Sequence, residues 1–342
     1  MMDHSVVVGF RRIMDRAGWL ALALLGAMVF MPFLTSDPLA YSIGTQILIG
    51  ASGALGVYVM LRMELLNFAI PGFMAVGGYA AAISASHGVT DIFALAAISF
   101  MLPGLLSIPV GAIVLRLKGV YFVLITYIFT EIVQLVLIET PSVTGGTDGL
   151  IGFPVLQAFG VQLTAYSSTF YVSLTLAALA FLVAIVTTRI FRQQFSSIAQ
   201  NDVLAESFGL TLWRYKTIGF FVSSGVAGLA GFSLVNMLLI AHPLSFTATS
   251  AVNYIAYAFI GGTGYLLGPL LGSALLVSVT NALSFSGEYS EGFFGIVIMI
   301  AVLVARGGLA GALANLWGKL GPRRFRQDYP RPASKVSVKG AQ

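Results

Sequence analysis

The chain has 342 residues, of which 58% are hydrophobic and 9% are charged, and its mean hydropathy is +0.92. Soluble domains carry about 25% charged residues, so this composition excludes an ordinary soluble protein and indicates an integral membrane protein. The absence of cysteine excludes disulfides, thiolate metal sites and cysteine nucleophiles.

Apolar segments of spanning length follow one another along the chain. A helix needs about 20 residues to cross the bilayer, and by this measure the sequence predicts an all-α fold with about ten spans. The eighth and tenth are short enough to be half-helices. If the ten spans divide into two halves of five, the halves have opposite topology in the membrane, because five is an odd number. The similarity of 73–79 to 259–265 is weak support for such inverted halves. The predicted spans are 18–35, 41–61, 67–86, 92–115, 119–138, 166–188, 217–240, 249–262, 265–285 and 292–306.

The positive charges predict the topology. With both termini cytoplasmic, all 18 Lys and Arg residues fall on the inner side, as the positive-inside rule requires. The expected organisation is a cytoplasmic segment 1–17, a transmembrane domain 18–306 and a basic tail 307–342. The apolar run 19–34 lacks a cleavage site, so we expect it to be retained. The positive charge faces lipid headgroups, so no nucleic acid partner is expected.

Glu131 is the only acid well inside a predicted span. Tyr127, Thr130 and Gln134 stand at helical spacing from it and form one polar stripe. A charge at this depth costs several kcal/mol unless it is paired, neutralised or hydrated. The stripe therefore either lines a water-accessible path or joins helices with Glu131 protonated. Two further polar candidates for such a path are Asn67 and Asn253.

The predicted outer loop 139–165 contains the run T-G-G-T-D-G-L, from Thr144 to Leu150. Its glycines permit left-handed turns. The run is either a solvated turn in which Asp148 caps a neighbouring element, or a surface that another protein binds. The candidate residues for that surface are Thr144, Gly145, Gly146 and Asp148.

The stretch 189–216 is the one long polar interval, and it predicts a short helix of about two turns. Asn201 is placed to cap the start of this helix. Asp202 and Glu206 suit its positive end. Gly209 permits the left-handed conformation that closes the last turn.

One face of this helix is apolar, because Leu204 and Phe208 are four residues apart and Val203 lies beside them. A short helix outside the bilayer lies on the membrane, folds back on its own chain or docks in a partner's groove. Burying one Phe or Leu side chain is worth about 1.5–3 kcal/mol, which fixes a docking register without holding a complex alone.

The end of this interval resembles the "EAA" loop of ABC importer permeases of the branched-chain amino acid type. The matching runs are Q-N-D at 200–202, A-E-S-F-G-L at 205–210 and R-Y-K at 214–216. In that family the short helix sits in a cleft of the ATPase subunit. Upstream, Ser196 and Ala199, like Gln200, replace the usual charged residues, which puts ionic contacts to the ATPase in doubt. The implied coupling residues are Asn201, Asp202, Leu204, Ala205, Glu206, Phe208, Gly209, Arg214 and Lys216.

Other runs are similar to the same type of permease. They are F-x-E-I-V at 129–133, the glycine-rich run at 144–150, and F-I-G-G-T-G-Y-L-L-G-P at 259–269. We expect the last to be an inner turn that leads into a helix, with Gly268 and Gly272 forming a packing face. It is not a phosphate loop, because G-x-x-x-x-G-K-[ST] occurs nowhere in the sequence. The turn residues are Gly261, Gly262, Gly264, Gly268 and Pro269.

One departure concerns the solute. The branched-chain type usually reads G-Q-L-S-L-G-H-A-A-F where this chain reads E-L-L-N-F-A-I-P-G-F at 64–73. Leu65 and Ile70 thus replace the usual Gln and His. The solute is therefore not fixed by the resemblance.

The resemblance covers about residues 45–311 and implies a permease subunit of an ATP-driven importer in the bacterial inner membrane. The implied solute is a branched-chain amino acid or a related acid or amide. The implied partners are two ABC ATPases that bind the ATP, a second permease of the same or another kind, an extracytoplasmic solute-binding protein and membrane lipid. We expect no enzyme activity, cofactor or metal in this chain. The alternative is an ion-coupled secondary transporter in which Glu131 carries protons.

Overall fold

The computed structural model describes residues 37–152, 156–158, 161–162 and 166–283, together with residues 23–26, 28, 295, 309 and 311. The predicted spans 18–35 and 292–306 lie outside the described residues except for isolated positions. The same holds for the predicted terminal segments.

Five described helices are long and apolar enough to cross a membrane, and three shorter helices lie in the other predicted spans between residues 41 and 285. Each predicted span from 41–61 to 265–285 overlaps one of these eight helices, so an α-helical membrane protein is confirmed. The total of ten spans and the inverted repeat stay predictions. The long helices are α4 (Pro38–Leu61), α6 (Ile92–Val114), α7 (Val120–Glu139), α9 (Tyr166–Ile190) and α12 (Leu212–Leu238), and the shorter ones are α5 (Ile70–Ser86), α13 (Ser250–Gly261) and α14 (Gly268–Leu283).

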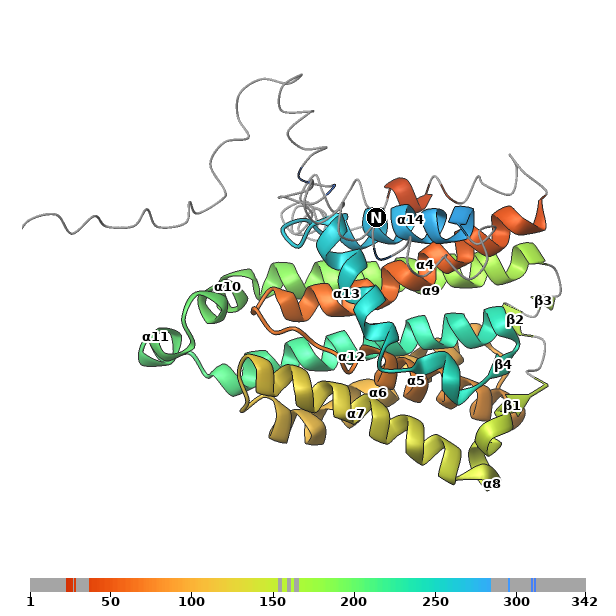
Figure 1. Ribbon diagram of the computed structural model, residues 1–342, viewed down its shortest axis with the longest axis horizontal. Helices are drawn as coiled ribbons and strands as arrows, with labels where there is room; N and C mark the ends of the chain where they lie inside the picture. Colours follow the sequence, from red (N-terminus) through yellow and green to blue (C-terminus); the bar gives the residue numbers. More distant parts are fainter. Residues whose placement is uncertain are drawn as a thin grey trace, which may run out of the picture.

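Helix α12 lies at the centre of the bundle, packed against α4, α5, α6 and α9 (Figure 1). Its glycines let the neighbouring backbones approach closely. A Cβ atom on Gly228 would overlap the carbonyl oxygen of Ser99 in α6, and one on Gly231 would overlap that of Met74 in α5. The central helix is therefore fitted to its neighbours at the level of the main chain.

Two of the long helices begin at acidic caps. The Asp37 carboxylate accepts a hydrogen bond from the Leu39 N–H at 3.0 Å, at the start of α4. The Asp91 carboxylate accepts one from the Ala94 N–H at 3.0 Å, at the start of α6. Both caps supply acceptors for N–H groups that have no partner within the helix.

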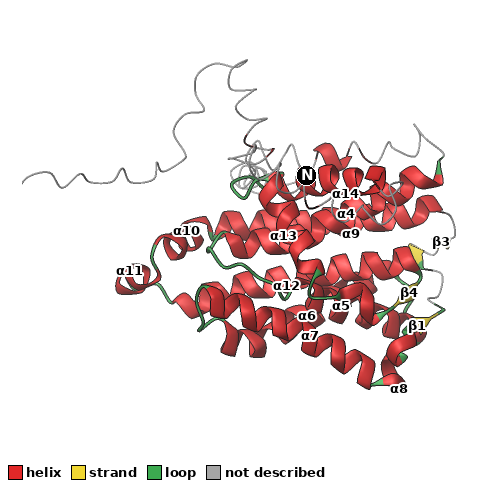
Figure 2. Ribbon diagram, in the orientation of Figure 1, coloured by secondary structure: helices red, strands yellow, loops and turns green. Residues whose placement is uncertain are grey.

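The two ends of the bundle differ (Figure 2). One end carries α10 (Arg192–Gln200) and α11 (Asp202–Ser207), and is called the α11 end below. The opposite end carries short strands that the sequence did not predict. There β1 (Leu150–Ile151) pairs antiparallel with β4 (Ile240–Ala241), and β2 (Gln157–Ala158) pairs antiparallel with β3 (Val161–Gln162). The short helices of this end are α8 (Pro141–Thr144), η1 (Gly146–Asp148) and η2 (Pro243–Phe246).

Candidate functional site

Helix α11 begins and ends as its sequence indicates. The side-chain oxygen of Asn201 accepts hydrogen bonds from the N–H groups of Val203 and Leu204, at 3.0 and 3.1 Å. Gly209 has φ +85°, and its N–H donates to the Glu206 carbonyl at 2.9 Å. These local bonds hold a six-residue helix that would be too short to be stable alone.

The apolar side chains of α11 point away from the bundle. Val203, Leu204 and Phe208 are 71%, 54% and 79% exposed, whereas Ala205 is buried against the protein. Glu206 is exposed beside them. Among the described residues, the apolar face of α11 is therefore not folded back against the rest of the chain.

Helix α10, which the sequence did not predict, anchors α11 to the bundle. Its Phe195 and Ile198 are almost fully buried, and the Phe195 ring stacks on Phe191 with centroids 6.0 Å apart. The spacing of four and three residues between these apolar side chains was the available signal for an amphipathic helix. The flanking residues are polar, so the interval as a whole was interpreted as a loop and the amphipathic pattern of α10 was missed.

Asp202 joins three segments at the α11 end. One of its carboxylate oxygens lies 2.8 Å from the Lys216 ammonium in α12 and 2.9 Å from the Lys118 ammonium, in the connection before α7. The Lys216 side chain is 5% exposed and that of Lys118 is 61% exposed. Burial acts to raise the pKa of Asp202, but the hydrogen bonds from Lys216 and Lys118 outweigh it and leave this pKa below its ordinary value.

This geometry changes the interpretation of two predicted loop residues. Helix α12 begins at Leu212, so Arg214 and Lys216 lie in its first turns rather than in a loop. Arg214 is exposed, but Lys216 is buried and paired within the chain. Lys216 thus holds Asp202 in place and presents no surface to a partner.

The connection between α4 and α5 is extended and buried next to α7. The Phe68 N–H donates to the Thr126 hydroxyl at 3.2 Å, and the Phe68 carbonyl accepts from the Thr130 hydroxyl at 3.1 Å. Two α7 side chains thus satisfy backbone groups that no helix satisfies, as non-helical backbone at membrane depth requires. Asn67 is fully buried there, accepting from the Ala69 N–H at 2.9 Å and donating to the Ser223 hydroxyl at 3.4 Å.

The predicted polar stripe is divided between two faces of α7. Thr130 is buried, Tyr127 and Gln134 are half-buried, and Glu131 is exposed on a face that otherwise carries apolar side chains. Only 17% of the most apolar stretch of α7 is buried. The Tyr127 ring lies 6.5 Å from the Phe68 ring. The apolar neighbours of Glu131 on the exposed face include Ile128, Ile132 and Leu135.

Asn253, the remaining candidate for a path, is half-buried on α13. That helix packs mainly against α4 and α14. The structure therefore groups Asn67, Tyr127 and Thr130 around Phe68, and places Asn253 on a different helix pair.

The run 144–150 forms a tight turn at the end opposite α11. Thr144 is buried, and its hydroxyl donates to the Thr140 carbonyl at 2.7 Å. Gly145 and Gly146 have φ +76° and +60°, and Asp148 is exposed. A Cβ atom on Gly149 would overlap the carbonyl oxygen of Ala241 in β4. The glycines thus allow the backbone to reach β4.

The run 259–269 joins α13 to α14. Gly262 and Gly264 lie in the turn, Gly262 has φ +110°, and Pro269 stands in the first turn of α14. A Cβ atom on Gly261 would overlap the Gly268 carbonyl oxygen, and one on Gly272 would overlap the Tyr257 carbonyl oxygen. The glycines of this run therefore set the close contact between α13 and α14.

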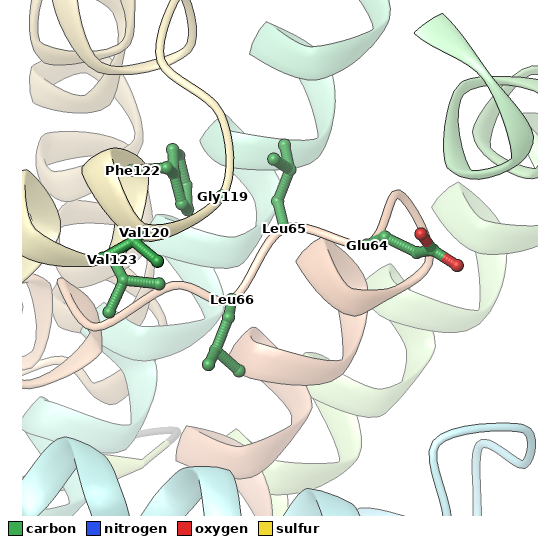
Figure 3. Close-up of a pocket in the computed structure, with 7 residues that line it drawn as sticks. All are labelled: Glu64, Leu65, Leu66, Gly119, Val120, Phe122 and Val123. Atoms are coloured by element: carbon green, nitrogen blue, oxygen red, sulfur yellow. The ribbon is translucent and has the colours of Figure 1, made fainter.

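A hollow of about 260 Å³ lies at the α11 end (Figure 3). It separates the extended stretch after α4, which carries Leu65 and Leu66, from the first turn of α7, which carries Val120 and Val123. The Glu64 carboxylate points away from these side chains (Figure 3). The lining is mainly aliphatic, and within the described part of the chain no group of three acidic, His or Cys side chains is placed to hold a metal ion.

Comparison with known proteins identifies the family. Residues 39–303 match the model of the family described as "Branched-chain amino acid transport system / permease component". The high-affinity branched-chain amino acid transport system permease proteins of Salmonella typhimurium and Escherichia coli are 26% and 25% identical, over 82% of this chain and 72% of theirs. The ribose import permease protein of Haemophilus influenzae is 24% identical, over 86% of this chain and 93% of its own.

No solved structure is significantly similar to the chain. The family match nevertheless extends from the start of α4 to beyond α14 and thus includes all the helices described above. The chain is a multi-pass membrane protein and belongs to the family of branched-chain amino acid transport system permease components.

Proposed function

We propose that this chain is a permease subunit of an ATP-driven ABC importer and that α11 is the element that binds the ATPase. Two cytoplasmic ATPases, a second permease and an extracytoplasmic solute-binding protein complete the complex. The α11 end and both termini are cytoplasmic, and the complex resides in the bacterial inner membrane. The observation that carries the proposal is the exposure of Leu204 and Phe208 on a capped helix in a member of a transport permease family.

The build of α11 favours a protein partner over a lipid surface. The helix is held rigid by its Asn201 cap and by the pairing of Asp202 with buried Lys216. It lies at the extremity of the bundle, beyond α10 (Figure 1). A helix that is already rigid loses little conformational entropy on binding. More of the free energy of burying Leu204 and Phe208 therefore contributes to the stability of the complex.

We place the solute path along α7. A carboxylate on an apolar helix face cannot be solvated by lipid chains, so Glu131 requires water or a protein partner there. The second permease packed against this face would enclose a hydrated path lined by Glu131, with Tyr127 and Gln134 at its edge. The proposed solute is a branched-chain amino acid or a related acid or amide, since two of the matched relatives carry that name.

The test of the function is reconstitution. The chain, the second permease and the ATPases are placed in liposomes with the binding protein outside, and uptake of radiolabelled leucine is followed with and without internal ATP. We expect uptake only with ATP and the ATPases. Uptake by the chain alone under a pH gradient, without nucleotide, would instead establish the secondary transporter.

Replacing Glu131 by Leu tests the path. We expect transport in the complete complex to fall by about tenfold or more, because a charge that orients water and solute is removed, while ATPase binding is unchanged. Glu139→Leu is the matched control, because it removes an exposed acid from the far end of the same helix. If Glu131 merely faced lipid, the Glu131→Leu variant would have a higher melting temperature and normal transport. That result would contradict the assignment of Glu131 to the solute path.

A further inference from the structure

We propose that Lys118 and Asp202 form a mechanical link that passes the displacement of α11 to α7. This inference rests on the proposed function, since it takes the ATPase to be what moves α11. In the link, Asp202 is the residue of α11 that both lysines contact: Lys216 ties it to α12, and Lys118 connects it to the start of α7. Asp202 and Lys118 are positioning residues and touch no solute.

The geometry supports different roles for the two lysines. Both ammonium groups contact the same Asp202 oxygen, Lys216 at 2.8 Å and Lys118 at 2.9 Å. Lys216 is buried in the packed α12, so its position is set by the bundle. Lys118 is largely exposed and belongs to the connection between α6 and α7. Asp202 thus bridges a fixed cation and a movable one.

The beginning of α7 has the freedom to respond. Gly119, directly after Lys118, has φ +56°, and no atom lies within 4 Å of the position a Cβ would take there. Val120 and Tyr121 in the first turn are 79% and 72% exposed. The hollow between this turn and Leu65 and Leu66 leaves space on the inner side as well (Figure 3). The first turn of α7 is therefore anchored by Phe122, which is almost fully buried, and loosely packed around Val120 and Tyr121.

The ion pair connects the proposed ATPase-binding helix α11 to the proposed solute path along α7. The order of the helices in the sequence does not show this connection. Through the chain itself, α11 connects to α10 and α12. Through the Lys118 ion pair it also connects to α7, whose Thr130 holds the extended stretch before α5 and whose neighbouring Glu131 faces the proposed path. A shift of α11 along this route tilts α7 at its Gly119 joint and changes the width of the path.

The test uses the complete reconstituted complex with Lys118→Met, and with Lys118→Gln as a second variant. Lys118 is largely exposed and Asp202 keeps its ion pair with Lys216, so the fold and ATPase binding are expected to be retained. ATP hydrolysis continues, but the leucine transported per ATP hydrolysed falls between about twofold and thirtyfold, the range for mutations that weaken coupling. Lys118→Arg keeps the cation and restores the ratio. Arg116→Met, which removes a nearby exposed cation, leaves it unchanged.

The outcomes separate this inference from the proposed function. Full transport per ATP in both Lys118→Met and Lys118→Gln would overturn the link while leaving the importer intact. Loss of ATPase binding in these variants would also overturn it, because Lys118 would then belong to the docking surface. Failure of the unaltered complex to bind ATPases would instead refute the proposed function itself.

Discussion

Phe208→Asp is expected to abolish ATP-driven transport while the membrane domain folds normally. The Phe208 side chain is 79% exposed, so the isolated chain gains almost nothing from it. In the proposed complex it is buried in the ATPase, and burying one Phe is worth about 1.5–3 kcal/mol. Loss of that burial weakens the complex by about tenfold to a hundredfold, and the desolvation of a new carboxylate weakens it further. ATPase binding to the detergent-solubilised chain measures the effect.

Ser196→Asp is the control for this substitution, because it places the same charge at an exposed position of the neighbouring helix α10, outside the apolar face of α11. We expect Ser196→Asp to bind ATPase nearly as the unaltered chain does. Leu204→Asp should reproduce the Phe208 effect, since Leu204 shares its face. Normal ATPase binding and transport by both apolar-face variants would show that α11 docks elsewhere or not at all.

Gly231→Ala and Gly228→Ala are expected to have the largest effect on stability. The added methyl group would overlap the carbonyl oxygen of Met74 or of Ser99, and a backbone atom cannot move aside as the end of a side chain can. Such overpacking costs about 1–3 kcal/mol or more. The central helix α12 contacts α4, α5, α6 and α9, so a shift in it disturbs the whole bundle. The melting temperature and size-exclusion profile in detergent measure the loss.

Gly225→Ala is the matched control on the same helix. There the new methyl group meets the ring of Phe100, which is half-buried and can rotate. We expect a much smaller decrease in melting temperature than for Gly231→Ala. Equal melting temperatures for all three alanine variants would contradict the close approach of α12 to Met74 in α5 and Ser99 in α6.

Local features of α11 were predictable because they depend on neighbours in the sequence. An Asn cap, an acid in the first turn and a glycine at the end act over two to four residues, and each occurs in the structure. The partner of Asp202 was not predictable in this way. Its contacts come from Lys118 and Lys216, which only the packing of separate helices brings to one oxygen.

The polar residues within the spans also show which features can be predicted from the sequence and which depend on tertiary contacts. Asn67, Thr130 and Glu131 were recognised because polar groups in an apolar segment are costly. The sequence could not tell which of them face the interior, since that depends on the neighbours of each helix. In the structure Asn67 and Thr130 bind the extended backbone around Phe68, and Glu131 alone points outward.

By itself the sequence determined that this protein is a helical membrane protein, where most of its helices lie, and that a short apolar-faced helix follows Asn201. Hydropathy, helix period and capping are properties of consecutive residues, so they can be counted along the chain. Only the tertiary structure decided that Lys216 is buried, that α10 anchors α11, and that α7 leaves Glu131 exposed, as it leaves Val120 and Tyr121 in its first turn. These features arise from contacts between segments distant in the sequence, whose distances no local pattern encodes.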